Sequence, residues 1–189
     1  DTDLLYAGSR ELPANFWETH GTGMESWKKD TKTGYRISGP LCRDFLLNEF
    51  VYDLNDPPFE AIVREVSGKT AVLETLIDYT HQKNAVWGIN ARNREQNFAL
   101  NLLMDPEIDF VSLLGQAGTG KTLLCRKLLQ EAPPHWTLAY LPDPNLSPLE
   151  LKWALALELG LKQSANIDGP QLAHLLQRQL LLLAAQQKQ

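Results

Sequence analysis

The chain has 189 residues, 43% hydrophobic and 22% charged, so it is long and apolar enough to bury a core and is not a disordered segment. Its net charge is −5, and residues 1–90 hold 9 Lys and Arg against 14 Asp and Glu, whereas residues 91–189 hold 9 of each. Nucleic-acid binding driven by bulk charge is therefore excluded, and any such binding would need a local basic patch.

Two widely separated cysteines, Cys42 and Cys125, give neither a zinc motif nor a disulfide framework, which favours a reducing compartment. No apolar run reaches the roughly 20 residues that span a bilayer, and no signal sequence follows Asp1. We expect a cytoplasmic protein with no membrane partner, and a chain that begins within a longer protein.

Residues 4–40 show no sustained period, and we expect mostly loop there. Within them, residues 27–36 interleave basic and aromatic side chains, which suits a surface for single-stranded nucleic acid or a solvated loop. Neighbouring acidic residues favour the loop. Residues 49–77 alternate apolar and polar side chains around a break at Ser67-Gly68, which predicts a hairpin within a β-rich unit over about residues 35–87.

The period lengthens after Asn90, and apolar residues at helical spacing predict a helix that Asp105-Pro106 ends. Residues 110–114 and 137–141 are short apolar runs typical of buried strands, with a helix over residues 123–131 between them. This order of strand and helix is typical of an α/β unit with a parallel sheet.

Ser147, Pro148 and Glu150 have the spacing of a helix N-cap and capping box, and Gly160 is expected to end that helix. A last helix is predicted from Pro170 to about Gln187. The fold class is therefore α/β, with a linker and small β-rich region over residues 1–87 and an incomplete P-loop NTPase domain with a parallel sheet over residues 88–189.

The segment between the first of those strands and its helix matches the phosphate loop G-x-x-x-x-G-K-[ST] at every fixed position. Glycines let backbone N–H groups turn toward phosphate oxygens, and the helix adds its positive dipole end. Lys121 would act on the β- and γ-phosphates as the catalytic residue, and the Thr122 hydroxyl would bind Mg²⁺. The predicted site for ATP and Mg²⁺ comprises Gly115, Gln116, Ala117, Gly118, Thr119, Gly120, Lys121, Thr122 and Leu123.

Two further residues bear on this site. Hydrolysis needs an acidic residue at the end of a neighbouring strand, but Pro142 precedes Asp143, and we interpret Asp143-Pro144 as a turn. The acidic strand is expected beyond Gln189, so ATP hydrolysis depends on its being supplied.

The amide of Gln96 could pair with adenine at N6 and N7, or it could belong to a solvated helix face; the pattern favours neither.

Residues 89–105 and 111–124 resemble the start of a PhoH-family ATPase domain. Residues 3–13 and 66–73 resemble the region that links a PIN nuclease domain to PhoH, so the resemblance covers about residues 1–124. It implies ATP-dependent unwinding and cleavage of RNA, with RNA as a partner, and it places Gln96 where the family has an adenine-contacting glutamine.

Residues 125–189 instead resemble the AAA-type ATPases of the ExeA/GspA secretion group, so we interpret the chain as a composite joined inside the phosphate-loop helix. Three functions stay open: an RNA-acting ATPase, a nucleotide-binding module without turnover, and a secretion-type motor fragment. A leucine stripe on the last helix is more often core than interface, but it also allows a homo-oligomer; its members are Leu175, Leu176, Leu180 and Leu183.

Overall fold

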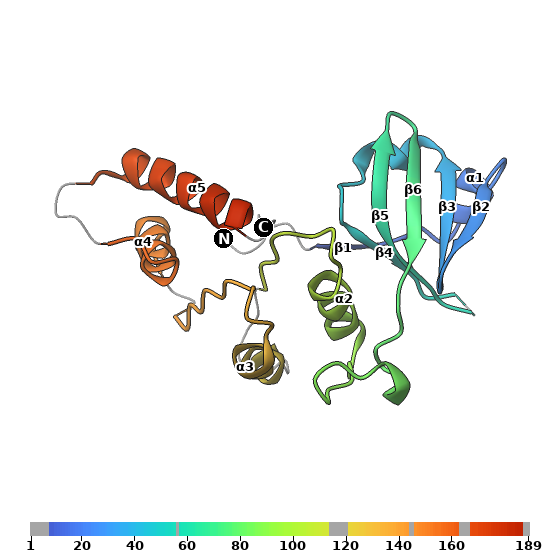
Figure 1. The fold of residues 1–189 in the computed structure, drawn as a ribbon. Coiled ribbons are helices and arrows are strands. Elements are labelled where there is room, and N and C mark those ends of the chain that lie inside the picture. The colour runs from blue at the N-terminus through green and yellow to red at the C-terminus, as the bar shows by residue number, and fades with distance from the viewer. Residues whose placement is uncertain (1–7, 56, 114–120, 144–145, 163–166, 187–189) are drawn as a thin grey trace. The chain divides into compact units, whose positions relative to one another are not determined.

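The computed structural model describes residues 8–55, 57–113, 121–143, 146–162 and 167–186 (Figure 1). The chain forms two compact units, Asp1–Leu113 and Leu114–Gln189, called here the N-terminal and C-terminal units. The fold class is confirmed as mixed α/β, with the β-rich part first. The first helix of the predicted NTPase domain, however, packs within the N-terminal unit, and the boundary at residue 88 stays a prediction.

A six-stranded sheet with the order β1-β4-β5-β6-β3-β2 forms the body of the N-terminal unit. Strands β1 and β4 are parallel, and the other neighbours are antiparallel. The strands are β1 (Ser9–Glu11), β2 (Glu25–Lys29), β3 (Lys32–Ser38), β4 (Phe50–Asp53), β5 (Phe59–Ser67) and β6 (Thr70–Thr75). The helices are α1 (Phe16–His20), the 3-10 helices η2 (Pro40–Asp44) and η3 (Gln82–Asn84), and α2 (Arg94–Leu103).

The prediction of a hairpin over residues 49–77 is confirmed by β4, β5 and β6, with the turn at Gly68. The prediction of loop over residues 4–40 is wrong, because this segment contains β1, α1, β2 and β3. All five residues of β2 are exposed, so this edge strand has no apolar face to give a period of two. Asp30, with a positive φ of 55°, closes the turn into β3.

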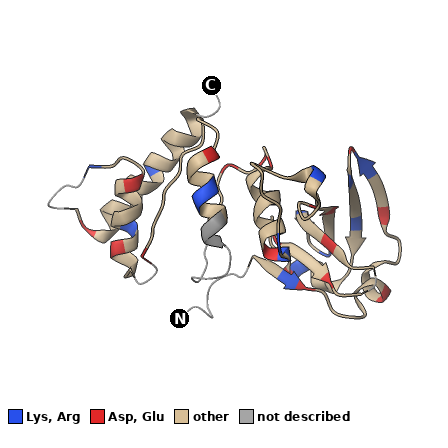
Figure 2. Ribbon diagram, turned by 90° about the horizontal axis from the view of Figure 1, so that it is seen from below, with Lys and Arg blue, Asp and Glu red and all other residues tan. Residues whose placement is uncertain are grey.

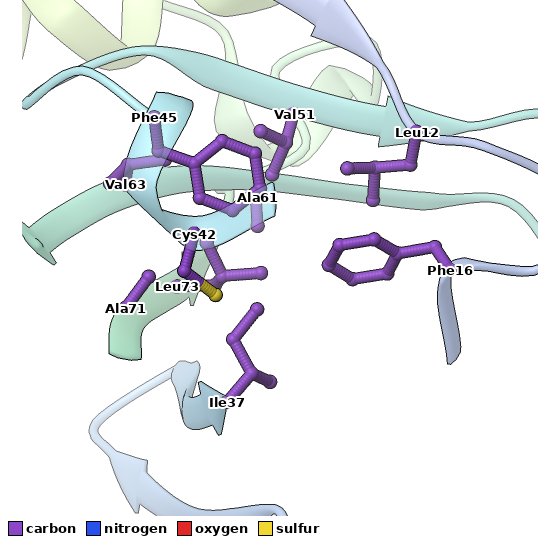
Figure 3. Close-up of a cluster of buried hydrophobic side chains, with 10 residues drawn as sticks. All are labelled: Leu12, Phe16, Ile37, Cys42, Phe45, Val51, Ala61, Val63, Ala71 and Leu73. Carbon is purple, nitrogen blue, oxygen red and sulfur yellow. The ribbon is translucent and has the colours of Figure 1, made fainter. Parts of the chain in front are cut away.

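One face of the sheet carries the main core, shown in Figure 3. Apolar residues from the strands alternate toward this face, and Phe16 of α1 and Cys42 of η2 cover them. The buried members are Leu12, Phe16, Ile37, Cys42, Phe45, Val51, Ala61, Val63, Ala71 and Leu73. Because helix and strand residues share one apolar cluster, the unit has the layered core expected of a small domain.

Helix α2 packs on the opposite face of the sheet. The Phe98 ring stacks on the Phe50 ring with centroids 4.3 Å apart, and Ile62 completes this second cluster. Two buried amides on the helix, Asn97 and Asn101, accept hydrogen bonds from the backbone N–H groups of Tyr79 and Ile77. The helix is thus fixed both to the sheet and to the segment that leads into it.

An ion network joins β3, β5 and β6 to the end of α2. Arg64 donates to Glu74 Oε1 from Nε at 3.2 Å and from Nη2 at 3.0 Å, and it also pairs with Asp105. Lys32 Nζ donates to the same Glu74 oxygen at 2.9 Å. Burial opposes the ionisation of Glu74, but the hydrogen bonds from Lys32 and Arg64 outweigh it and hold its pKa below the ordinary value of 4.5.

We expect acid to destabilise the N-terminal unit through this network. The pKa of Asp105 is also lowered: burial raises it, but the Glu107 N–H and Arg64 outweigh burial. Both carboxylates therefore stabilise the fold above their unfolded pKa values, and that stabilisation is lost as pH falls through the lowered folded values. In Arg64→Met, the free energy of unfolding should depend less on pH below about 4.5, as measured by urea unfolding at several pH values.

Arg36→Met is the matched control, because the ion pair of Arg36 with Glu25 is exposed and lies outside the network of Arg64, Glu74 and Asp105. This control should keep the wild-type pH dependence. An Arg64→Met variant whose stability falls with acid as steeply as that of the wild type would contradict the role given to the network.

The C-terminal unit consists, in its described residues, of three helices: α3 (Lys121–Glu131), α4 (Pro148–Glu158) and α5 (Gly169–Gln186). The predicted capping box is confirmed, because the Ser147 and Glu150 side chains each accept from the other's backbone N–H. Gly160, with a φ of 82°, follows the end of α4 as expected. Three of the four predicted stripe leucines of α5 belong to the core: Leu176 is buried in the cluster shared with α4, and Leu180 and Leu183 pack against it. Leu175 is only partly buried. Leu172, which was not predicted, is also buried in this cluster.

The two strands predicted for the NTPase domain do not form in the described part of the chain. Residues 110–113 and 137–141 have no regular secondary structure and no strand pairing, and Phe110 is 66% exposed. A β-strand is stabilised by ladder hydrogen bonds to a neighbour, and an apolar run without such a partner gains none of them. The apolar residues of these two segments therefore predicted buried strands, but the segments are not buried in the structure.

Candidate functional site

The phosphate-loop residues Gly115, Gln116, Ala117, Gly118, Thr119 and Gly120 lie outside the described residues. The backbone is described again from Lys121, where α3 begins (Figure 1). Lys121, Thr122 and Leu123 form the first three positions of this helix, as the motif requires. A helix that starts at this point has N–H groups in its first turn without intrahelical partners, which is the arrangement that binds anions.

Helix α3 is anchored by leucines one turn apart. Leu124 and Leu128 are buried at 5% and 6% exposure, and their spacing of four residues puts them on one face. Lys127 and Glu131 form an ion pair at 3.8 Å, and both side chains are partly exposed. Apolar burial thus holds α3 through the face that carries Leu124 and Leu128.

Gln96 lies in the first turn of α2 and has a structural role there. Its backbone N–H donates to the Asn93 side chain at 2.9 Å, and its Oε1 accepts from the Arg92 N–H at 2.8 Å. Sequence reasoning did not find this cap, although Asn93 three residues before Gln96 is the spacing of a capping box. The Oε1 atom retains a second lone pair and Nε2 is a donor, so capping and adenine contact are chemically compatible.

Asp143, the carboxylate weighed for Mg²⁺, is exposed and lies in irregular backbone after residues 137–142. The predicted turn partner, Pro144, lies outside the described residues. Because residues 137–141 form no strand, the described structure does not bring Asp143 to a strand end, the place where such a carboxylate acts.

Gln96 and the phosphate loop belong to different compact units, the first to the N-terminal and the second to the C-terminal unit. The described residues contain no group of three or more His, Cys, Asp or Glu side chains able to hold a metal ion. Among the same residues, we find no helix with both the length and the apolar character needed to cross a membrane.

Comparisons with known proteins agree with the phosphate-loop motif. Residues 107–188, which include α3, α4 and α5, match the AAA domain family. The chain is 54% identical over 132 residues to Protein PhoH2 of Bacillus subtilis, and 59% identical over 39 residues to Protein PhoH2 of Thermobispora bispora. The chain is therefore related to PhoH2 proteins and carries an AAA domain. No solved structure matches it significantly.

The resemblance to the PhoH family is thus confirmed, and the AAA match at residues 107–188 supports a P-loop nucleotide-binding domain. The similarity covers 66% of this chain but only 26% of the Bacillus subtilis protein, and 21% of this chain but only 9% of the Thermobispora bispora protein. The chain therefore spans a minor part of the length of its curated relatives.

Proposed function

We propose that the chain binds Mg-ATP through residues 115–122 and uses ATP hydrolysis to remodel RNA. The observation that carries the proposal is the phosphate-loop sequence followed at once by the start of α3, within a segment that matches the AAA domain family. Backbone amides and the helix dipole would hold the phosphates, and Lys121 would neutralise charge on the β- and γ-phosphates. Thr122 would supply a hydroxyl ligand to Mg²⁺. RNA as substrate, a cytoplasmic location and self-association are parts of this proposal.

Gln96 would select adenine in this proposal. Replacing it by glutamate keeps an acceptor for the Arg92 N–H and removes the donor for adenine N7. We therefore expect Gln96→Glu to retain the stability of α2 and to reduce the preference for ATP over GTP by about tenfold, the order of one bidentate contact. Competition of ATP and GTP for a fluorescent nucleotide measures this preference. An unchanged preference with unchanged stability would leave Gln96 as a capping residue only.

The second candidate is a module that binds ATP without turnover. It is favoured by one observation: the described residues place no carboxylate at the end of a paired strand in the C-terminal unit, and Asp143 lies in irregular backbone. A secretion-type motor fragment is the third candidate, and its support is the AAA match at residues 107–188.

Nucleotide binding and phosphate release, measured with and without single-stranded RNA, separate these candidates. RNA-stimulated phosphate release supports the proposed function. Tight Mg-ATP binding with phosphate release at the background rate supports the second candidate, and ATP hydrolysis that RNA does not alter favours the third. Absence of Mg-ATP binding would contradict all three.

A further inference from the structure

The edge hairpin of β2 and β3 carries an indole that lies against the sheet surface. Trp27 pairs with Gly34 across the two strands, and a Cβ atom at Gly34 would lie only 2.4 Å from Trp27 Cε2. Position 34 therefore needs glycine, because any side chain would displace the ring. Trp27 is nevertheless 39% exposed, so part of the indole is open to solvent.

Charged side chains lie beside this indole on the same face. Residues two apart in a strand share a face, and the register places Glu25 opposite Arg36 and Lys29 opposite Lys32. The guanidinium carbon of Arg36 lies 5.8 Å from the centroid of the Trp27 ring. We call Trp27, Lys29 and Arg36 the hairpin platform; Figure 2 colours the charged positions of these strands.

The nearby acidic residues leave most of the positive charge of Lys29 and Arg36 available to a ligand. Glu25 pairs with Arg36 at 3.3 Å, but the two side chains are 68% and 53% exposed, so solvent screens the pair strongly. Lys32 is engaged by Glu74 and belongs to the ion network. Lys29 is exposed and forms no ion pair with the described residues.

We propose that the hairpin platform is a contact surface for single-stranded nucleic acid, with one base stacked on Trp27 and phosphates paired with Lys29 and Arg36. A presented aromatic ring beside basic side chains matches the two groups that a single strand exposes, base faces and phosphates. In a duplex the base faces are already stacked on each other. The charged rim around Trp27 favours this ligand over an apolar peptide.

This inference deepens the proposed function, because it names a surface that would contact RNA. It rests on the proposed function only for the choice of RNA as the nucleic acid. The two remain separable. The platform lies in the N-terminal unit, whereas the phosphate loop lies in the C-terminal unit. Nucleic-acid affinity measured without nucleotide tests the platform alone, whereas Mg-ATP affinity measured without nucleic acid tests the phosphate loop alone.

The test uses the 189-residue chain and fluorescein-labelled oligouridine of about 12 nucleotides, with binding followed by anisotropy. Trp27→Ala should raise the dissociation constant about fivefold or more, which is the order of one lost stacking contact, while Trp27→Phe should restore much of the affinity. Circular dichroism of each variant checks that the sheet is intact. Oligothymidine of the same length separates RNA from DNA, and equal affinity for both supports a platform for either single strand.

Adjacent lysines on opposite faces of β2 supply the matched control. Lys29→Glu should weaken oligouridine binding more than Lys28→Glu, because Lys28 lies on the other face of the strand. Glu25→Gln should strengthen binding by removing repulsion of phosphate. The proposal is overturned if Trp27→Ala binds oligouridine like the folded wild type, if the two lysine variants are equal, or if an RNA duplex binds more tightly than the single strand.

Discussion

Lys121→Ala is expected to weaken Mg-ATP binding about 10- to 100-fold. An ammonium that donates to a phosphate makes a charge-assisted hydrogen bond, and such bonds contribute about 1.5–3 kcal/mol. The backbone amides of the loop and the dipole of α3 would remain, so the loss should be large but incomplete. Titration calorimetry with ATP in the presence of Mg²⁺ measures the change in the dissociation constant.

Lys127→Ala is the matched control for this experiment. Lys127 lies on the same helix, but its ammonium pairs with Glu131 at 3.8 Å and is half-exposed. Because an exposed pair one helical turn apart contributes little, this variant should bind ATP like the wild type and remain folded. Equal ATP affinities of the wild type and Lys121→Ala would mean that nucleotide does not contact the loop at Lys121.

Phe98→Ala is expected to destabilise the N-terminal unit by about 3–5 kcal/mol, the range for removing a buried aromatic side chain. Phe98 is 5% exposed and stacks on Phe50, so its loss opens a cavity between α2 and the sheet. The same helix carries Gln96 and the amides that fix residues 77–79. Urea unfolding followed by circular dichroism measures the change in the free energy of unfolding.

Phe98→Leu should cost less than Phe98→Ala, because leucine fills more of the space that the ring leaves. Ala99→Gly, on the same helix but away from the stacked rings, should cost only about 1 kcal/mol through its lower helix propensity. If Phe98→Ala were as mild as Ala99→Gly, the contact between α2 and the sheet would not hold the unit together.

The sequence predicts those elements whose pattern reflects their own burial or local chemistry. The alternation of β5 and β6 follows from one face being core, and the capping box at Ser147 is a local hydrogen-bond pattern. Strand β2 was missed because an edge strand whose residues are all exposed carries no apolar alternation. Its pairing depends on β3, and no property of residues 25–29 alone reveals that partner.

The two predicted strands of the NTPase domain fail for the opposite reason. Residues 110–113 and 137–141 have the apolar character of strands, but pairing depends on neighbours distant in sequence. At the candidate site, the motif predicts the phosphate loop, whose residues 115–120 lie outside the described residues, and a helix directly after it, where α3 begins. The sequence left Gln96 open between an adenine contact and a solvated helix face, and neither alternative includes the hydrogen bond that its Oε1 accepts from the Arg92 N–H.

The most direct test of nucleotide binding at the phosphate loop is a crystal structure of the chain with Mg²⁺ and a non-hydrolysable ATP analogue. We expect phosphate oxygens within hydrogen-bond distance of backbone N–H groups at residues 118–122, with the Thr122 hydroxyl bound to Mg²⁺ and Lys121 at the terminal phosphates. A triphosphate bound at any other place on the chain, or a phosphate loop without contact to it, would mean that residues 115–122 do not form the nucleotide site.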